Sequence, residues 1–265
     1  MSSQTSIEET FKRIMAKNEQ MQRERREFMA TQPQIIRCRV HPDCERLIDE
    51  KLTASATADN GGTHKAGYTP CQKCREEAEL DRLQDCGVPE ILLRATFENF
   101  MPDSEDDAGH VEVVKAFCEA RRGFLILLGG FGTGKSHLAA AALRTFGRGW
   151  FIGHNSLLLA LRATYRDHAA FNPIERAQAA RLFVLDDVGL SGGGKDELPM
   201  LHEIFNHRHN ERLPTIITSN LQYNGLASVL GERMTDRLRE SAFRVLMFNG
   251  ASHRRDARQR YFDEP

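Results

Sequence analysis

The sequence predicts an α/β protein built on a parallel β-sheet that carries helices on both faces. From about residue 83 onward, short apolar runs alternate with longer stretches of helical periodicity, and this alternation is typical of parallel sheets with helical crossovers. A glycine-rich turn joins the first of these runs to a helix, and a pair of acidic residues ends another run. These observations fix the fold class and indicate where a functional site lies.

The composition is that of a chain that folds in water. Of its 265 residues, 40% are hydrophobic and 28% are charged, and the formal net charge is −1. The longest apolar runs, such as Phe124–Leu128, are far too short to cross a bilayer, and the polar N-terminus lacks the apolar core of a signal peptide. We therefore expect a cytoplasmic protein with no membrane contact. Because there is no global excess of basic residues, any contact with nucleic acid must be local.

The first element, residues 1–35, has the pattern of one long amphipathic helix. Its apolar side chains recur at three- and four-residue steps along one stripe, and Pro33 is a plausible stop. An exposed apolar stripe needs a cover, so this helix either packs on its own domain, self-associates or docks on a partner protein. The stripe consists of Ile7, Phe11, Ile14, Met21 and Phe28.

Residues 36–82 hold four of the six cysteines. Cys38 and His41 form one pair at C-x2-H spacing, and Cys71 and Cys74 form a second at C-x2-C spacing. Two such pairs supply four ligands at the spacing of a tetrahedral structural zinc site, with Cys44 as an alternate ligand. The competing interpretation is a set of free thiols in a linker, and a cysteine cluster of this kind favours a reducing compartment.

Residues 83–265 form the α/β region. Three stretches have helical periodicity, namely Ser136–Phe146, Ser156–His168 and Glu197–Asn210. Five runs read as strands because they are short, apolar and bounded by turn residues. These runs are Phe124–Leu128, Trp150–Gly153, Leu182–Leu185, Thr215–Thr218 and Arg244–Phe248.

The glycine-rich turn matches the pattern G-x-x-x-x-G-K-[ST] and has the required context, directly after a strand and at the start of a helix. Glycines let backbone N–H groups turn toward phosphates, and the helix N-terminus adds a positive dipole end. Lys135 is expected to reach the β- and γ-phosphates of ATP, and Ser136 to ligate Mg²⁺. The predicted nucleotide-binding residues are Gly129, Gly130, Phe131, Gly132, Thr133, Gly134, Lys135, Ser136 and His137.

Two further strands end in polar side chains. Asp186 and Asp187 end the run Leu182–Leu185; the first suits a magnesium ligand, and the second can orient an attacking water. Asn220 follows the run Thr215–Thr218 and can hydrogen-bond the γ-phosphate or the water. The alternative for each of these residues is that its polar side chain only stabilises the turn that follows the strand.

Together these motifs resemble the DnaC/DnaI-type replicative helicase loaders of the AAA+ class, a group that includes the IstB-type transposition helper ATPases. The resemblance covers roughly residues 87 to 255 and depends on the order and spacing of several short motifs. Besides the glycine-rich turn, they are Gly87-Val88-Pro89, Thr96-Phe97-Glu98-Asn99-Phe100, Leu185-Asp186-Asp187-Val188-Gly189, Thr218-Ser219-Asn220, Leu230-Gly231-Glu232-Arg233, Asp236-Arg237-Leu238-Arg239 and Ser252-His253-Arg254.

The resemblance implies a sheet with strand order 5-1-4-3-2 and an assembly of several subunits. It implies that Asn220 is the sensor 1 residue, that Arg237 is an arginine finger reaching the next subunit, and that Arg254 is the sensor 2 residue. The segment before the glycine-rich turn, including Phe97 and Phe100, would lie near the adenine. Many AAA+ proteins have Glu where this chain has Asp187, which is one methylene shorter, so we expect slow hydrolysis that suits a switch better than a motor.

The zinc cluster favours a helicase loader over a transposition helper, because some loaders of the DnaI type and related phage proteins carry a zinc-bearing N-terminal region that binds the helicase. A phage or prophage version fits as well as a bacterial one. The expected partners are a DnaB-type helicase, single-stranded DNA and further copies of the chain assembling with ATP. The alternatives are an IstB-type helper acting on duplex DNA and a zinc-bearing adaptor with an inactive ATPase domain.

A DNA contact is predicted on the helix Ser156–His168, because the resemblance places this element on the inner face of the assembly. Arg162 and Tyr165 are three residues apart and share a helix face, so one can neutralise a phosphate while the other stacks on a base. The alternative is that this helix only packs its leucines on the sheet, with Tyr165 at the margin of the core.

Overall fold

The computed structural model describes residues 20, 35–37, 40–41, 43–47, 70–102, 104–164, 172–189, 197–240, 242–250 and 252. The chain divides into two units, Met1–Ala78 and Glu79–Pro265. The division falls inside helix α3 (Gln72–Asp85). The predicted N-terminal helix over residues 1–35 lies outside the described residues, Gln20 and Ile35 apart.

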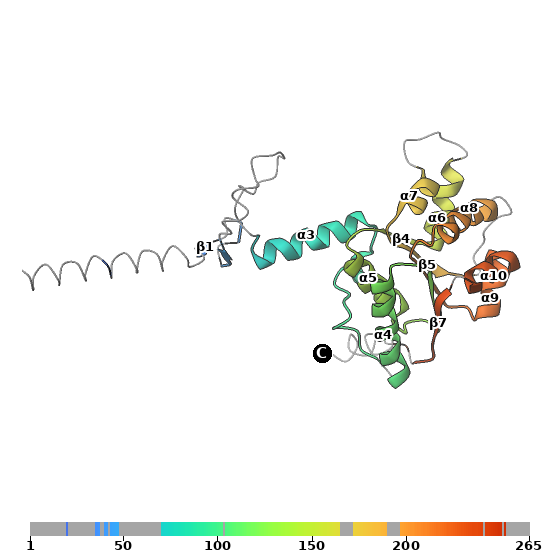
Figure 1. The fold of residues 1–265 in the computed structure, drawn as a ribbon, viewed down its shortest axis with the longest axis horizontal. Helices are drawn as coiled ribbons and strands as arrows, with labels where there is room; N and C mark the ends of the chain where they lie inside the picture. Colours follow the sequence, from blue (N-terminus) through green and yellow to red (C-terminus); the bar gives the residue numbers. More distant parts are fainter. Residues whose placement is uncertain are drawn as a thin grey trace, which may run out of the picture. The chain divides into compact units, whose positions relative to one another are not determined.

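Five parallel strands form the sheet of the larger unit (Figure 1). In the order in which they lie side by side they are β4, β5, β6, β3 and β7, and all four pairings are parallel. Counted from the first strand of this sheet, the order is 2-3-4-1-5, so the predicted fold class and strand order are confirmed. The strands are β3 (Phe124–Gly129), β4 (Trp150–Gly153), β5 (Phe183–Val188), β6 (Thr215–Ser219) and β7 (Ala242–Phe248).

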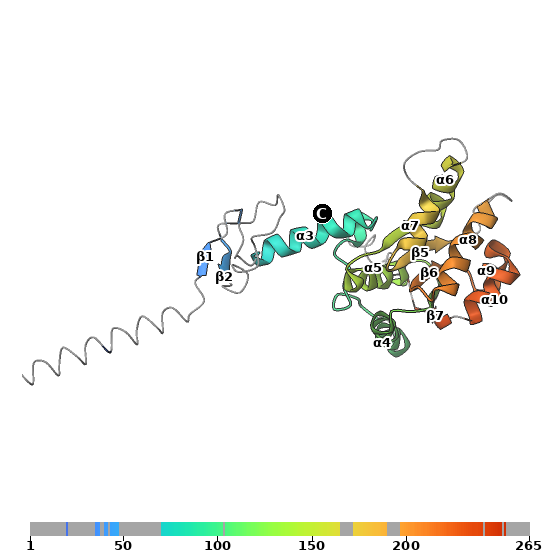
Figure 2. The same cartoon turned by 45° about the horizontal axis from the view of Figure 1, so that its top comes forward.

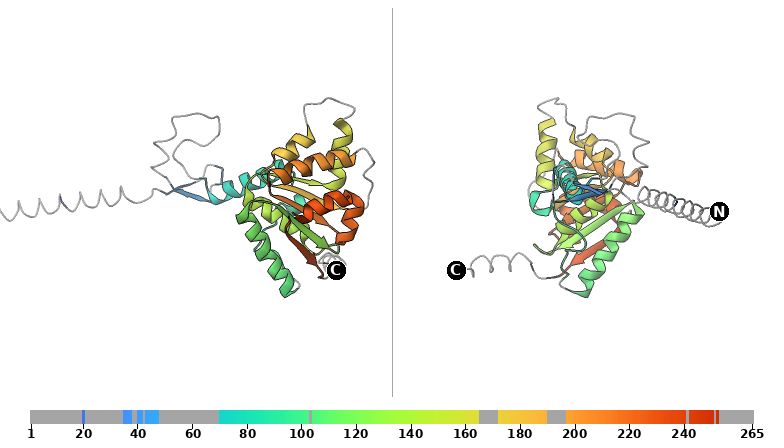
Figure 3. Two further views of the ribbon diagram at one scale, coloured as in Figure 1. Left: turned by 45° about the vertical axis from the view of Figure 1, so that its right-hand side comes forward. Right: turned by 90° about the vertical axis from the view of Figure 1, so that its left-hand side faces the viewer.

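Helices cover both faces of this sheet (Figure 3). One face packs against α4 (Glu105–Ala120) and α5 (Lys135–Phe146). The other face carries α6 (His154–Thr164), α7 (Pro173–Ala179), α8 (Glu197–Asn210), α9 (Tyr223–Leu230) and α10 (Glu232–Glu240). Of these helices, α9 and α10 lie side by side (Figure 2). Among the described helices, none has the length and apolar character needed to span a membrane.

The central strand β3 shows why its sequence is apolar without interruption. Leu125 and Leu127 point into the core with α4 and α5, whereas Phe124, Ile126 and Leu128 point into the core on the opposite face. All five are at most 1% exposed. A parallel strand with helices on both sides buries both of its faces, so alternation between apolar and polar residues is lost.

The predicted helix Ser156–His168 begins two residues earlier than expected, at His154. It is described as far as Thr164, and residues 165–171 lie outside the described part of the chain. Helix α7 then begins with the signals expected of a helix N-terminus. Asn172 caps it by accepting hydrogen bonds from the backbone N–H groups of residues 174 and 175, and Pro173 takes the first helical position.

A glycine allows the end of α3 to run beside the sheet. The backbone N–H of Phe151 in β4 donates to Cys86 O at 2.7 Å. Gly87 follows with φ of +85°, and a Cβ at this position would lie 2.4 Å from Phe151 O. Both the left-handed backbone and the close approach exclude a side chain here, so Gly87 fixes how the chain crosses from α3 to the nucleotide-binding motif.

Arg208 of α8 is a fully buried cation whose recorded hydrogen-bond acceptors are all uncharged. Its guanidinium lies over the ring of Phe183, and burial lowers the pKa of Arg208 to about 9, which leaves it charged at neutral pH. It joins the end of α7 to the start of β6, because its acceptors are the carbonyl oxygens of Ala177, Gln178, Ala180 and Pro214 and the hydroxyl of Thr215.

We expect Arg208→Ala to lower the free energy of unfolding by at least about 3 kcal/mol, because it creates a cavity and leaves buried carbonyls without donors. Urea unfolding followed by circular dichroism measures this loss. Arg148→Ala is the matched control, since Arg148 is exposed, and should change stability by less than about 0.5 kcal/mol. Equal stability of the two variants would contradict the role assigned to Arg208.

Candidate nucleotide site and metal centre

The glycine-rich turn lies between β3 and α5, where the sequence places it. Gly134 caps α5 with φ of +87°, and a Cβ there would lie 2.4 Å from the ring of Phe100. Glycine is therefore required at this position both for its backbone conformation and because Phe100 packs against it. The first helical residues, Lys135 and Ser136, follow at once, and the first N–H groups of an α-helix have no acceptor within the helix itself.

The ammonium group of Lys135 lies inside this loop. It donates to Gly129 O at 2.9 Å, to Gly130 O at 2.5 Å and to Thr133 Oγ1 at 3.3 Å. The side chain is only 5% exposed. A loop that wraps a cation and also points backbone N–H groups inward can hold polyphosphate, since the same ammonium can turn from carbonyl oxygens to phosphate oxygens.

Asp186 is the point where the loop helix and two strands meet. Its Oδ1 accepts a hydrogen bond from Ser136 Oγ at 2.7 Å and another from Thr218 Oγ1 at 2.6 Å. Burial raises the pKa of Asp186, while the hydrogen bonds from Thr218 and Ser136 lower it. A hydroxyl and a carboxylate oxygen so close together are hard ligands of the kind that Mg²⁺ prefers.

Asp187 has a different environment from its neighbour. It is exposed, and its φ of +56° lies in the left-handed region. The β5–β6 register shifts between Leu185 and Val188, so both acids lie where the ladder is irregular. Asp187 N donates to Thr218 Oγ1 at 2.9 Å, and Asn220 Nδ2 donates to Asp187 Oδ1 at 2.5 Å, which places the carboxylate and the amide as one polar pair.

These residues line a single cleft of about 400 Å³. Its apolar wall comes from Pro89, which belongs to one of the motifs of the resemblance, and from the short helix η1 (Glu90–Leu92). Ile91 of this helix is 90% exposed and was not singled out from the sequence. Phe97 and Phe100, which the resemblance places near the adenine, are not among the lining residues. The cleft is lined by Pro89, Ile91, Leu92, Phe131, Gly132, Thr133, Gly134, Lys135, Ser136, His137, Asp186, Asp187, Thr218 and Asn220.

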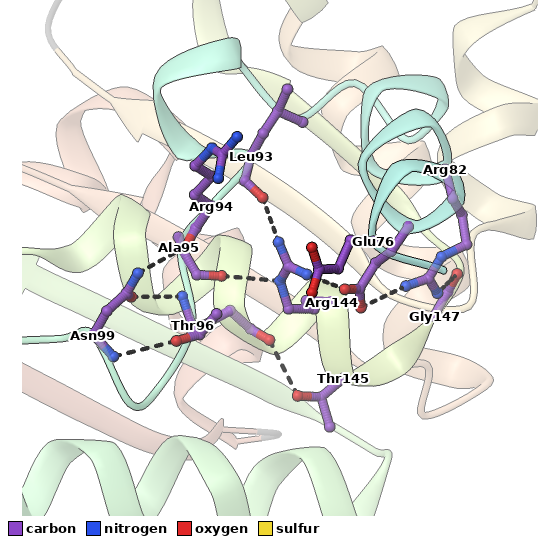
Figure 4. A network of polar contacts seen from close by, with 12 residues as sticks. Glu76, Arg82, Leu93, Arg94, Ala95, Thr96, Asn99, Arg144, Thr145 and Gly147 are labelled. Atoms are coloured by element: carbon purple, nitrogen blue, oxygen red, sulfur yellow. Dashed lines mark hydrogen bonds and ion pairs between the residues drawn. The ribbon is translucent and has the colours of Figure 1, made fainter. Parts of the chain in front are cut away.

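A network of polar contacts fixes the segment behind this wall to α5 (Figure 4). Arg144 donates to Ala95 O at 3.1 Å and to Leu93 O, and pairs with Glu79. His137 Nε2 lies 2.9 Å from Thr96 O. Because the acceptors are backbone carbonyls, the helix that begins with the phosphate loop also sets the position of the chain that forms the apolar wall.

The arginines predicted to act on the γ-phosphate differ in their surroundings and in whether the structure describes them. Arg237 lies in α10 and is partly buried, and its guanidinium donates to Asn206 Oδ1 of α8. Arg233 and Arg239 are exposed on the same helix. Arg254 lies outside the described residues. The arrangement within one subunit therefore leaves Arg237 away from the lining of its own cleft.

The predicted DNA contact is described only in part. Arg162 is exposed near the end of α6, while Leu157, Leu158 and Leu161 pack into the core. Tyr165 lies outside the described residues. Leu159 is 64% exposed on the outward face of the same helix, so the face that carries Arg162 also carries an apolar side chain in contact with water.

A buried imidazole lies beside the acid pair. His154 opens α6 directly after β4, and Gly153 pairs with Asp186 in the sheet. His154 is 1% exposed, and among the described residues neither of its ring nitrogens has a hydrogen-bond partner. Burial lowers the pKa of His154, and the nearby negative charge of Asp187 opposes that shift.

The metal-ligand candidates lie in the smaller unit. Strands β1 (Ile35–Arg37) and β2 (Glu45–Leu47) form a short antiparallel hairpin. His41 lies in the turn of this hairpin, and its Nδ1 is 3.6 Å from Cys71 Sγ and 3.4 Å from Cys74 Sγ. Ligands bound to one tetrahedral zinc ion are about 3.5 Å apart when one is nitrogen and the other sulfur. The three donor atoms therefore fit zinc.

The two cysteines of this group come from the start of one helix. Cys71 precedes α3 and Cys74 lies in its first turn, where Cys74 N donates to Cys71 Sγ at 3.4 Å. Cys38, the fourth predicted ligand, lies outside the described residues, and Cys44 is described in the hairpin turn, where its N–H donates to His41 O.

A phosphate loop between strand and helix, with paired acids on a strand of a 2-3-4-1-5 sheet, defines an AAA+ ATPase domain. The chain belongs to the IstB-like ATP binding protein family, whose model matches residues 98–260, more than half of the chain.

Known proteins agree with this assignment. The replicative helicase loader DnaC of Buchnera aphidicola is 30% identical over 186 residues, which are 64% of this chain and 73% of the relative. DnaC of Escherichia coli K12 is 25% identical over 177 residues, covering 63% of this chain and 72% of that protein. A crystal structure of the DnaC helicase loader shares the fold, with a TM-score of 0.56 and 22% identity over 61% of this chain and all of that chain.

We expect acid to destabilise the protein partly through His154. The unfolded state takes up a proton near pH 6.5, whereas the buried folded-state imidazole, with its lowered pKa, does not. The unfolded state then binds more protons, so the free energy of unfolding falls as pH drops below about 6.5.

His154→Leu should weaken this fall, as measured by urea unfolding at pH 7.5 and pH 5.5. Exposed His207 on α8 provides the control, and His207→Leu should keep the pH dependence of the parent. A pH dependence unchanged in His154→Leu would show that His154 makes no such contribution.

Proposed function

We propose that this protein is an ATP-dependent loader that binds a replicative ring helicase of the DnaB type and delivers it onto single-stranded DNA during initiation of replication. The similarity to the helicase loaders over 186 residues carries the proposal. The nucleotide cleft supports it, because a loader of this kind needs an ATP site to time its release. A cytoplasmic location follows from this function.

In this proposal ATP binds in the cleft with its phosphates on residues 129–136. Lys135 leaves the carbonyls of Gly129 and Gly130 and contacts the β- and γ-phosphates. Ser136 and Asp186 hold Mg²⁺, and their oxygens are already 2.7 Å apart. The ion neutralises phosphate charge when it is bound. The base lies against Pro89, Ile91 and Leu92, which supply apolar surface at the rim of the cleft.

Asp187 orients the attacking water, and Asn220 holds that carboxylate through the 2.5 Å hydrogen bond. A short aspartate keeps the base farther from the phosphate than glutamate does, so turnover is slow. Slow hydrolysis lets the nucleotide state persist long enough to mark a step in an assembly process. The domain then acts as a switch whose two states are the ATP-bound and ADP-bound forms.

Self-assembly with ATP brings in the arginines. Arg237 is proposed to reach the nucleotide of the next subunit, which requires it to leave Asn206, and Arg254 to contact the γ-phosphate of its own subunit. Single-stranded DNA is proposed to follow the face of α6 through Arg162 and Tyr165.

The N-terminal part is proposed to contact the helicase. We propose that residues 1–35 are an amphipathic helix, that residues 36–82 hold a structural zinc ion and that residues 83–265 are the ATPase domain. The zinc ligands are His41, Cys71 and Cys74 with Cys38 as the fourth, or Cys44 in its place. Such an ion closes the loop between the hairpin and α3, which a region of this size needs in order to fold.

Lys135→Ala should weaken ATP binding by at least about tenfold, because it removes a charge-assisted contact to the phosphates. Asp187→Asn should leave affinity nearly unchanged and slow hydrolysis by about a hundredfold, the range expected when a general base is lost. Titration with a fluorescent ATP analogue and a phosphate-release assay measure the two effects. Lys115→Ala, which removes a half-buried lysine paired with Glu112 outside the cleft, should match the parent. Wild-type affinity in Lys135→Ala would exclude this cleft as the ATP site.

The function is tested with the full chain, a DnaB-type helicase and circular single-stranded DNA coated with single-strand-binding protein. We expect the chain to bind the helicase and to enable unwinding of an annealed oligonucleotide at least about tenfold faster than helicase alone, since a closed ring needs help to enter a circle. Lys135→Ala should lose this stimulation, and Lys115→Ala should keep it. If the protein neither binds nor stimulates the helicase but stimulates a transposase on duplex DNA, it is instead a transposition helper. If it binds the helicase and ATP changes neither binding nor unwinding, it is an adaptor.

A further inference from the structure

The imidazole of His41 is held from both of its ring nitrogens. Nδ1 lies 3.4 Å from Cys74 Sγ and 3.6 Å from Cys71 Sγ, within the group proposed to hold zinc. On the opposite side of the ring, Nε2 lies 3.0 Å from Oε1 of Glu77. Glu77 was not singled out from the sequence, because nothing in the spacing of cysteines and histidines includes a glutamate.

The carboxylate decides which nitrogen of His41 carries the proton. An ionised glutamate has acceptor oxygens and no hydrogen to donate, so Nε2 must be the N–H donor of this hydrogen bond. In the neutral imidazole the other nitrogen then carries no proton, and that nitrogen is Nδ1, which lies near the two sulfurs. Metal binding needs this neutral form with an unprotonated nitrogen directed at the ion.

We propose that Glu77 is a positioning residue of the metal centre, which keeps His41 in the Nε2–H tautomer and directs Nδ1 toward the ion. This inference depends on the proposed zinc site. The inference also gives α3 a second role at this site. Cys74 and Glu77 are three residues apart in α3 and therefore lie on one face. The first two turns of α3 thus supply the sulfur of one ligand and the carboxylate that orients another, which comes from the hairpin.

The size of the effect follows from exposure. Carboxylates that hold a ligating histidine change metal affinity by about 10- to 100-fold. The side chain of Glu77 is 60% exposed, and that of His41 is 15% exposed, so water can replace part of the lost hydrogen bond. We therefore expect an effect near the lower limit, about tenfold.

The competing explanation is a surface ion pair between a charged histidine and Glu77 with no role for the metal. A charged histidine carries a proton on Nδ1 as well as on Nε2, so such a pair can exist only in the metal-free protein, and its loss would leave zinc affinity unchanged or raise it. A positioning role acts on zinc affinity instead, since it sets the protonation and direction of a ligand. Metal affinity therefore separates the two explanations.

The matched variants are Glu77→Gln and Glu76→Gln in the full-length protein. Each removes one negative charge from the same turn of α3, but Glu76 contacts Gln72 and not the histidine. Zinc affinity is measured by competition with a chromophoric chelator. Cobalt substitution gives a visible spectrum that reports whether thiolate and imidazole ligands remain in a tetrahedral site.

We expect the parent and Glu76→Gln to bind one zinc ion with equal affinity, and Glu77→Gln to bind one zinc ion about tenfold more weakly with a tetrahedral cobalt spectrum. Equal affinity in Glu77→Gln and Glu76→Gln would overturn the role of Glu77 while leaving the zinc site intact. Cys71→Ser is expected to bind no zinc. If the parent protein also binds none, the proposed metal centre is overturned, and the role of Glu77 with it.

Discussion

The carboxylate of Asp186 accepts two hydroxyl hydrogen bonds, and the geometry of the nucleotide cleft depends on them. One donor, Ser136, is the second residue of the helix that follows the glycine-rich turn, and the other, Thr218, lies near the end of β6. The contacts join α5, β5 and β6 at the carboxyl edge of the sheet, where loops of parallel α/β proteins form their sites. Because Asp186 is buried enough for its pKa to rise, losing either donor would leave a desolvated carboxylate and loosen this junction.

Helix α5 carries the same constraint to the other side of the cleft. Its first residues contact Asp186, while His137 and Arg144 hold the backbone at Thr96, Ala95 and Leu93. One rigid helix thus sets the distance between the phosphate loop and the apolar wall. A ligand that fills the cleft meets both surfaces already in place, and preorganisation of this kind reduces the ordering that binding must otherwise cost. Glu79, which pairs with Arg144, connects this frame to the end of α3.

The group of candidate metal ligands and the buried arginine show how polar groups are satisfied away from the cleft. Among the described residues Arg208 pairs with no acid, yet its five hydrogen bonds to uncharged acceptors satisfy carbonyls that would otherwise be buried without donors. In the smaller unit, His41 has sulfurs on one side and a carboxylate on the other. In both places a planar side chain with several nitrogens links segments that lie far apart in the sequence.

The sequence by itself determined the α/β class, the strand order through the family resemblance, the position of the glycine-rich turn and the pair Cys71 and Cys74. Apart from the strand order, these features are local: strand burial, the turn between β3 and α5 and the start of α3 each depend on residues within a few positions of one another. Only the tertiary structure brought Thr218 to Asp186, Ile91 to the rim of the cleft, Glu77 to His41 and Arg237 to Asn206. The three side-chain contacts join residues 31 to 36 positions apart, and Ile91 is placed by the packing of other elements. Sequence spacing carries no signal for such contacts, because the path of the chain between the partners decides whether they meet.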